Sequence, residues 1–167
     1  MKRSESANSD PGKTLPASFI RNEGVKSEAK TDSTNNGASV AAASEREVRA
    51  VYAEWTKSAV RGDWAKHLDF YADYVEYFRD KKLTRAEIGS RKRNTFRALD
   101  SYSLKFSPSP EVRLRQEGGA QEADISFDRA WRLKRNGKWI DGKAHGVITL
   151  RRDSRGWQIV SEKQVKK

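Results

Sequence analysis

Two residues near the C-terminus carry side chains suited to acid–base chemistry. Asp141 and His145 lie four positions apart in a segment that alternates like a β-strand, so both side chains should point to the same side. A carboxylate can orient an imidazole for general base catalysis. Lys143 lies between them on that side, which indicates a hydrated strand face. Because a hydrated face is a poor place for an acid–base site, Asp141 and His145 are an alternative acid–base pair and not the preferred site. The opposite side holds the residues expected in the core: Ile140, Gly142, Ala144, Gly146, Ile148 and Leu150.

A single arginine interrupts an otherwise apolar strand face. Arg129 lies in the alternating series Ala123, Ile125, Phe127, Arg129, Trp131 and Leu133. If this face lines a pocket, the guanidinium is half-buried and can bind a carboxylate or phosphate through two hydrogen bonds. Two alternatives remain open: a β-bulge that turns Arg129 outward, or an ion pair with an acid such as Asp63.

Composition excludes several classes of site. The chain has no Cys, so disulfides, thiolate metal sites and Cys nucleophiles are ruled out. His67 and His145 are too few for a His-based metal site without carboxylates, and we expect no metal and no cofactor. His67 is expected to be partly exposed and structural. No apolar run is long enough to span a bilayer, and the first residues lack the apolar region of a signal peptide, so a cytoplasmic location is the default expectation.

The net charge of +11 falls almost entirely after residue 44. An excess of this size is typical of proteins with an anionic partner, such as nucleic acid, an acidic protein or a membrane surface. The alternative, which we favour, is a solvated basic face, because acidic residues are interspersed throughout. No stacking platform with RNA-binding motifs accompanies the basic residues, so we expect no specific nucleic-acid partner.

The N-terminal quarter is expected to differ from the rest. Residues 1–43 are polar and free of Trp and Tyr, which is typical of a disordered tail or a linker to a covalently attached domain. Ser44 and Glu47 form a capping-box pattern, so we expect a first helix from Ser44 to about Arg61 and a folded domain over 44–167. Asp63 should cap a short second helix, and a turn at Asp73 should lead into a strand over 74–78.

The second half predicts one more helix followed by paired strands. Residues 79–82 should form a charged turn, and Thr84 with Glu87 repeats the capping-box pattern at the start of a helix to about Leu99. This helix should expose a basic face that includes Lys92. Alternating strands follow from Asp100, and Asn136-Gly137 predicts a hairpin turn. Because the connections are short, neighbouring strands should be antiparallel.

Four sequence pieces, taken in order, resemble the SnoaL-like branch of the nuclear transport factor 2-like superfamily. They are Arg61-Gly62-Asp63, the segment 71–77 (YADYVEY), the segment 83–88 (LTRAEI) and the segment 156–162 (GWQIVSE). The resemblance covers about residues 45–163. It implies a cystatin-like α+β cone, with three helices packed on a curved, mainly antiparallel sheet.

The resemblance also implies a pocket inside the cone. Its expected wall residues are Tyr52, Trp55, Tyr71, Tyr77, Arg129 and Trp131. Because many relatives are non-catalytic, we expect a ligand-binding or protein-interaction domain. The alternative is an isomerase, dehydratase or cyclase that acts on a small organic substrate, and a second alternative is a basic anion or nucleic-acid binding module. We also expect a homodimer, because relatives pair through the sheet and because Trp139, Val147 and Trp157 or Val160 should lie on its outer face.

Overall fold

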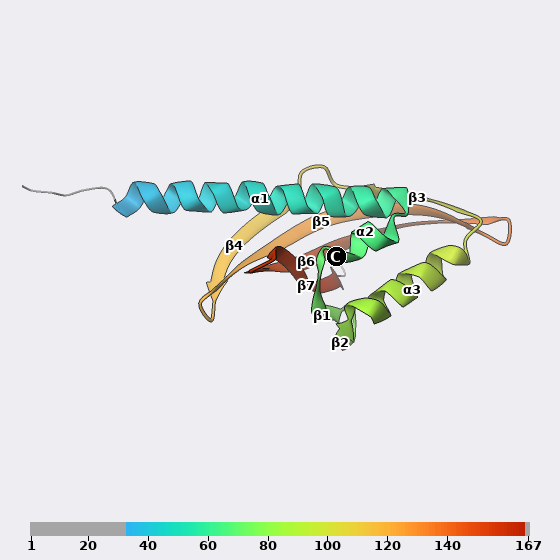
Figure 1. Cartoon of the computed structure of the whole chain (residues 1–167). Coiled ribbons are helices and arrows are strands. Elements are labelled where there is room, and N and C mark those ends of the chain that lie inside the picture. Colours follow the sequence, from blue (N-terminus) through green and yellow to red (C-terminus); the bar gives the residue numbers. More distant parts are fainter. Residues whose placement is uncertain (1–32, 166–167) are drawn as a thin grey trace, which may run out of the picture. The chain divides into compact units, whose positions relative to one another are not determined.

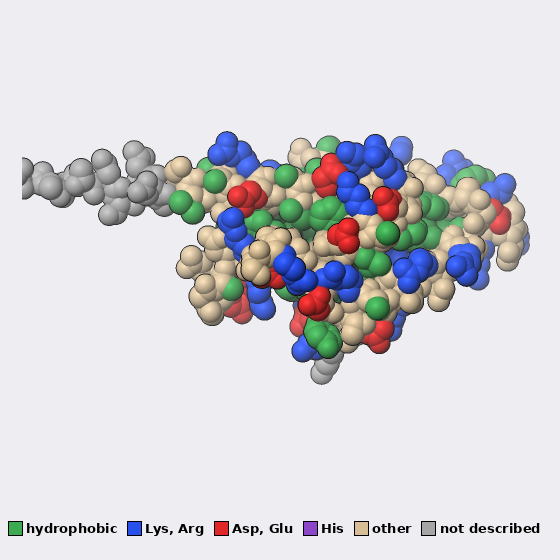
Figure 2. All heavy atoms as spheres, viewed as in Figure 1, with side chains coloured by type: hydrophobic (Ala, Val, Ile, Leu, Met, Phe, Trp, Pro, Cys, Tyr) green, Lys and Arg blue, Asp and Glu red, His purple; other side chains and the backbone are tan. Residues whose placement is uncertain are grey.

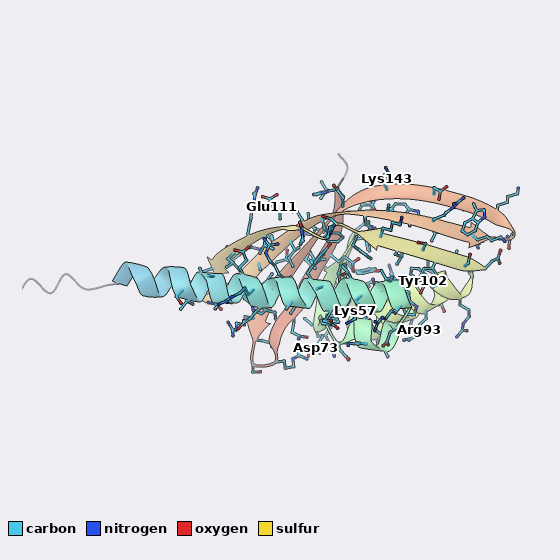
Figure 3. All side chains as sticks on the ribbon, turned by 90° about the horizontal axis from the view of Figure 1, so that it is seen from above. Lys57, Asp73, Arg93, Tyr102, Glu111 and Lys143 are labelled. Atoms are coloured by element: carbon cyan, nitrogen blue, oxygen red, sulfur yellow. The ribbon has the colours of Figure 1, made fainter. Side chains whose placement is uncertain are left out.

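The computed structural model describes residues 33–165, without the side chains of residues 33–38, 80 and 81. In these residues three helices pack on one face of a seven-stranded sheet (Figures 1 and 3). The elements in chain order are α1 (Ser33–Arg61), α2 (Trp64–Leu68), β1 (Tyr71–Tyr77), β2 (Asp80–Thr84), α3 (Arg85–Arg97), β3 (Ser101–Phe106), β4 (Glu111–Glu117), β5 (Ala120–Arg135), β6 (Lys138–Asp153) and β7 (Gly156–Val165).

The sheet has the strand order β2-β1-β7-β6-β5-β3, and β4 pairs with β5 beside β3. Only the β1–β7 pair is parallel, which confirms the predicted α+β class with a mainly antiparallel sheet. The two longest strands, β5 and β6, form a hairpin through Asn136 and Gly137. Both residues have positive φ, 50° and 74°, as a type I′ turn requires.

The first helix begins earlier than the sequence pattern indicates. Helix α1 starts at Ser33, so Ser44 lies within the helix and is buried, and the predicted N-cap at Ser44 is wrong. Residues 41–43 are alanines that continue the helix, because Ala favours helix although this turn contributes little to the core. Of the predicted tail, residues 1–32 lie outside the described residues.

The chain around β1 also differs from expectation. Asp73 lies inside β1 rather than at a turn, with its exposed carboxylate 2.7 Å from Arg85 and 3.2 Å from Arg155. Part of the expected charged turn is instead strand β2, and the turn itself includes Phe78 with φ 54°. The two predicted N-caps, Asp63 and Thr84, are confirmed. The side chain of Asp63 accepts a hydrogen bond from Lys66 N, and Thr84 and Glu87 form a reciprocal capping box.

The core forms where the apolar stripe of α1 meets the inner face of the sheet. From α1 it takes Val48, Tyr52, Trp55 and Ala59, which pack against the buried strand residues Ile125, Phe127, Ile148, Leu150 and Ile159. Burial of each large apolar side chain contributes about 1.5–3 kcal/mol. Figure 2 shows apolar side chains between α1 and α3, bordered by Lys and Arg with interspersed acids.

Two residues depart from the predicted faces of the sheet. Ile140 is 52% exposed, because it lies near the tip of the β5–β6 hairpin, so the core face of β6 begins further along the strand. Trp157 or Val160 was expected on the outer face; of the two, Trp157 is buried on the helix side, where its Nε1 donates to Glu47 of α1 at 3.0 Å. The inward position follows from its pairing with Arg152, which shares the inner face with Leu150.

The outer face of the sheet is largely charged. Glu122 is buried there between Arg115 and Arg151, each with a guanidinium nitrogen 2.6 Å from a carboxylate oxygen. Lys143 points away from the helices on the same face, whereas Lys57 extends from α1 on the other side (Figure 3). No helix within residues 33–165 is both long and apolar enough to cross a membrane.

Candidate ligand-binding site

A cavity of about 400 Å³ lies between the helices and the inner face of the sheet. We call it the cone cavity. Helix α3 contributes one part of its lining and β5 another, and residues of α1, α2, β3, β7 and the end of β1 complete it. Its lining is mainly aromatic and aliphatic: Trp55, Ala59, Trp64, Tyr77, Phe78, Phe96, Leu104, Phe106, Ala130, Trp131 and Leu133. The polar and charged lining residues are His67, Arg91, Lys92, Thr95, Arg129, Glu162 and Gln164.

An irregularity in β7 determines which polar residues enter the cavity. Leu150 pairs with Ile159, but Thr149 pairs with Ser161, so Val160 is an extra residue that forms a β-bulge. The bulge reverses the alternation, and as a result Ile159 and Glu162 both point inward. Without it, Glu162 would face outward with the solvent-facing residues of the sheet.

Glu162 is the carboxylate of the cavity, and its side chain is only 3% exposed. The hydroxyl of Tyr71 donates to its Oε2 at 2.5 Å, and Lys92 Nζ lies 3.5 Å from the same oxygen. Tyr71 is fully buried, and burial, with Glu162 adding to the effect, raises the pKa of its hydroxyl well above 10. Tyr71 therefore remains a neutral donor to the carboxylate.

His67, which also lines the cavity, continues this hydrogen-bonded group to Ser58 and Trp55 of α1. Its Nδ1 lies 3.0 Å from Ser58 Oγ and 3.1 Å from the carbonyl oxygen of Trp55, and its Nε2 lies 3.3 Å from the Tyr71 hydroxyl. Burial, together with the positive charge of Lys92, lowers the pKa of His67 well below 6.5. His67 is thus a buried neutral imidazole, and the expectation of a partly exposed side chain is wrong.

Lys92 enters the cavity from α3, although the predicted basic helix face placed it in solvent. Its side chain is 12% exposed, and Nζ lies 5.5 Å from the ring centres of both Tyr71 and Tyr77. Burial lowers the pKa of Lys92 below 10.5, the negative charge of Glu162 opposes this shift, and Arg129 adds to it. Ser58, His67, Tyr71, Glu162 and Lys92 form one continuous series of contacts, which we call the polar chain.

Arg129 lines the cavity from β5. Its guanidinium carbon is 5.6 Å from the ring centre of Phe78 and 5.7 Å from that of Trp131. Its Nη2 donates to Gln164 Oε1 at 3.1 Å, and its Nε is buried with no hydrogen-bond partner among the described residues. Neither alternative placement, outward rotation or pairing with Asp63, occurs.

The other predicted pocket residues divide into two groups. Trp55, Tyr77 and Trp131 line the cavity with Arg129. Tyr52 and Tyr71 do not line it: Tyr71 lies behind the wall in the polar chain, and the Tyr52 hydroxyl donates to the carbonyl of Ser107 at 3.0 Å.

Asp141 and His145 lie outside the cone cavity and do not pair with each other. Asp141 is exposed on the outer face, 3.4 Å from Arg132. His145 Nδ1 lies 2.8 Å from an oxygen of Asp128 on the neighbouring strand. The structure therefore does not bring the alternative acid–base pair together.

Six polar or charged lining residues were not predicted for the pocket from the sequence: His67, Arg91, Lys92, Thr95, Glu162 and Gln164. A signal existed for Lys92, because Ile88, Lys92 and Phe96 follow at four-residue spacing and share the inner side of α3. No signal existed for Glu162, because the bulge that turns it inward leaves no mark in the alternation. Among the described residues, no group of His, Asp and Glu is arranged to hold a metal ion.

Comparison with known proteins supports the fold. No family model and no curated protein matches the sequence. A nuclear transport factor 2-like superfamily protein from Salmonella enterica aligns with a TM-score of 0.64 at 13% identity, over 75% of this chain and 92% of that one. A protein with a cystatin-like fold from Novosphingobium aromaticivorans aligns with a TM-score of 0.60 at 21% identity, over 81% and 90%.

A third solved structure is described as a candidate scytalone dehydratase, also from Novosphingobium aromaticivorans. It aligns with a TM-score of 0.60 at 10% identity, over 78% of this chain and 88% of that one. At these identities the likeness concerns the fold, and it confirms the resemblance seen in the sequence at that level. The chain has the nuclear transport factor 2-like, cystatin-like α+β fold.

Proposed function

We propose that this domain binds a small organic anion with an aromatic ring in the cone cavity. The observation that carries the proposal is the charge of the cavity wall. Arg91, Lys92 and Arg129 line it, whereas Glu162 is the one carboxylate among its described lining residues. His67 is neutral, so the wall has an excess of positive charge that an anionic ligand would offset.

Arg129 is the anchor in this proposal. A buried N–H group without a partner costs about 1–3 kcal/mol, and its Nε is such a group. A ligand carboxylate that accepted from Nε would remove this cost and gain a charge-assisted hydrogen bond. The rings of Phe78 and Trp131 flank the guanidinium, so they offer an aromatic ligand a surface beside the charged group.

The volume limits the size of the ligand. A cavity of about 400 Å³ is near the lower end of the range of about 300–1,000 Å³ for small-molecule sites. One or two fused rings with a carboxylate fit such a volume. Trp55, Trp64 and Trp131 line the cavity, so a bound ring should change the tryptophan fluorescence.

The test is a fluorescence and calorimetric titration with benzoate and 2-naphthoate, compared with the uncharged benzamide and 2-naphthamide. We expect the acids to bind more tightly, and Arg129→Leu to weaken their binding at least tenfold. Arg132→Leu, which removes an exposed arginine of the outer face, is the matched control and should leave affinity unchanged. Equal binding of acid and amide, unaffected by Arg129→Leu, would contradict the proposal.

A second candidate is an enzyme, an isomerase, dehydratase or cyclase that acts on a small organic substrate. It is favoured by Glu162, a carboxylate at the wall of an apolar cavity with a neutral Tyr71 donor behind it. In a screen of small aromatic substrates, Glu162→Gln should abolish turnover and His145→Ala should leave it intact. If His145→Ala were the variant that lost activity, the site would be the outer face instead.

A further inference from the structure

We propose that Lys92 forms an imine with a small aromatic aldehyde or ketone held in the cone cavity. This inference rests on the proposed function only in that the cavity must admit a small aromatic molecule. It goes further because it assigns a covalent chemistry to Lys92.

The position of Lys92 distinguishes it from the other cations of α3. Arg91, Arg93 and Arg97 on the same helix are exposed, although Arg91 also borders the cavity, whereas the cavity-lining side chain of Lys92 is only 12% exposed. A buried ion pair contributes little to stability, because desolvation offsets most of its attraction. Stability therefore gives no sufficient reason for a lysine at this position, and its amine faces the space where a ligand would lie.

The surroundings of Lys92 favour a reactive amine. Burial lowers the pKa of Lys92, the nearby charge of Arg129 lowers it further, and Glu162 acts in the opposite direction with a net shift that remains downward. The other titratable groups near Lys92 are the phenols of Tyr71 and Tyr77, whose pKa values burial raises, and the neutral His67. A lysine in an apolar pocket near another cation is a recognised way to activate a nucleophilic amine.

Glu162 is placed to move the protons of the reaction. Its Oε2 lies 3.5 Å from Nζ and can accept the ammonium proton, after which the neutral amine attacks the carbonyl carbon and forms the C–N bond. The carbonyl oxygen becomes a hydroxyl by taking the second amine proton. Glu162 then returns its proton to that hydroxyl, which leaves as water as the C=N bond forms. The balance is one ammonium group and one carbonyl compound giving one protonated imine and one water, with Glu162 again a carboxylate.

The test uses 4-carboxybenzaldehyde, which carries both the carboxylate for Arg129 and the aldehyde for Lys92. The protein is incubated with the aldehyde and sodium cyanoborohydride near neutral pH, where the hydride reduces any imine to a stable secondary amine. Peptide mass spectrometry then locates the adduct. We expect a single dominant adduct on Lys92, formed at least tenfold faster than on any exposed lysine.

Three variants separate the chemistry from folding. Lys92→Arg keeps a cation beside Glu162 but removes the primary amine, so it should fold and give no dominant adduct. Lys105→Met removes an exposed lysine of β3 and should leave the labelling of Lys92 unchanged. Glu162→Gln should slow labelling at least tenfold.

The outcomes distinguish this inference from the proposed function. Benzoate binding without a Lys92 adduct would overturn the imine and leave the ligand-binding proposal standing. Labelling spread over exposed lysines, with the same yield in Lys92→Arg, would overturn it as well. If neither benzoate nor the aldehyde changed the tryptophan fluorescence and no adduct formed, both proposals would fail.

Discussion

Tyr71→Phe is the substitution that tests the polar chain most directly. The hydroxyl it removes donates to Glu162 at 2.5 Å and accepts from Trp55 Nε1 at 3.2 Å, and all three side chains are buried. A hydrogen bond to a charged group contributes about 1.5–3 kcal/mol, and a buried N–H left without a partner costs about 1–3 kcal/mol. Some of this loss will be recovered by relaxation and water, so we expect the free energy of unfolding to fall by about 3 kcal/mol.

Tyr52→Phe is the matched control, because Tyr52 is also buried on the inner side of the sheet. Its hydroxyl makes one hydrogen bond, to the carbonyl of Ser107 at 3.0 Å, so its loss should cost about 1 kcal/mol. Both substitutions delete one oxygen and leave the ring in place, so the difference between them reports the contacts of the hydroxyl.

Urea denaturation followed by circular dichroism measures both free energies. The midpoint should fall about three times further for Tyr71→Phe than for Tyr52→Phe, with no change in the slope of the transition. Equal losses for the two variants, or a Tyr71→Phe loss below about 1 kcal/mol, would refute the reasoning that Tyr71, Glu162 and Trp55 form an energetically coupled group.

Three further predictions concern pH, packing and assembly. The pKa of His67 is lowered on folding, so below pH 6.5 the unfolded state binds a proton that the folded state does not. The free energy of unfolding should therefore fall as the pH drops below 6.5, by up to about 1.4 kcal/mol per pH unit. Urea midpoints between pH 7 and 5 should show this fall, and His67→Gln should reduce the pH dependence. Gly142→Ala should destabilise by about 1–3 kcal/mol, since the new Cβ would overlap the Trp131 ring. Lys143→Ala should change the melting temperature little, and equal shifts for the two variants would contradict the close packing. We predict a homodimer through the outer face of the sheet, where Trp139 is 49% exposed. Light scattering at micromolar concentration should give the mass of a dimer, and Trp139→Glu should lower that mass. A monomer mass at this concentration would contradict the prediction.

The sequence by itself determined the elements whose signals are local. The Thr84–Glu87 capping box, the Asp63 cap and the Asn136-Gly137 hairpin all follow from contacts within a few residues, and the structure confirms each one. The period-two alternation of β5 aligned Arg129 with the core residues but left open whether a bulge turned it outward. The structure puts it on the inner face, because a strand without a bulge keeps its alternation along its whole length.

Only the tertiary structure decided which charged residues enter the cavity. Glu162 points inward because β7 carries a bulge at Val160, and the register against β6 that creates the bulge involves residues outside β7 itself. Lys92 is largely buried because Glu162, which is 70 positions away in the sequence, is its ion-pair partner. The hydroxyl of Tyr71, 91 positions before Glu162, donates a hydrogen bond to the same carboxylate. Burial of a charge costs a large amount of free energy unless such a distant partner is present, so local sequence patterns could not predict it.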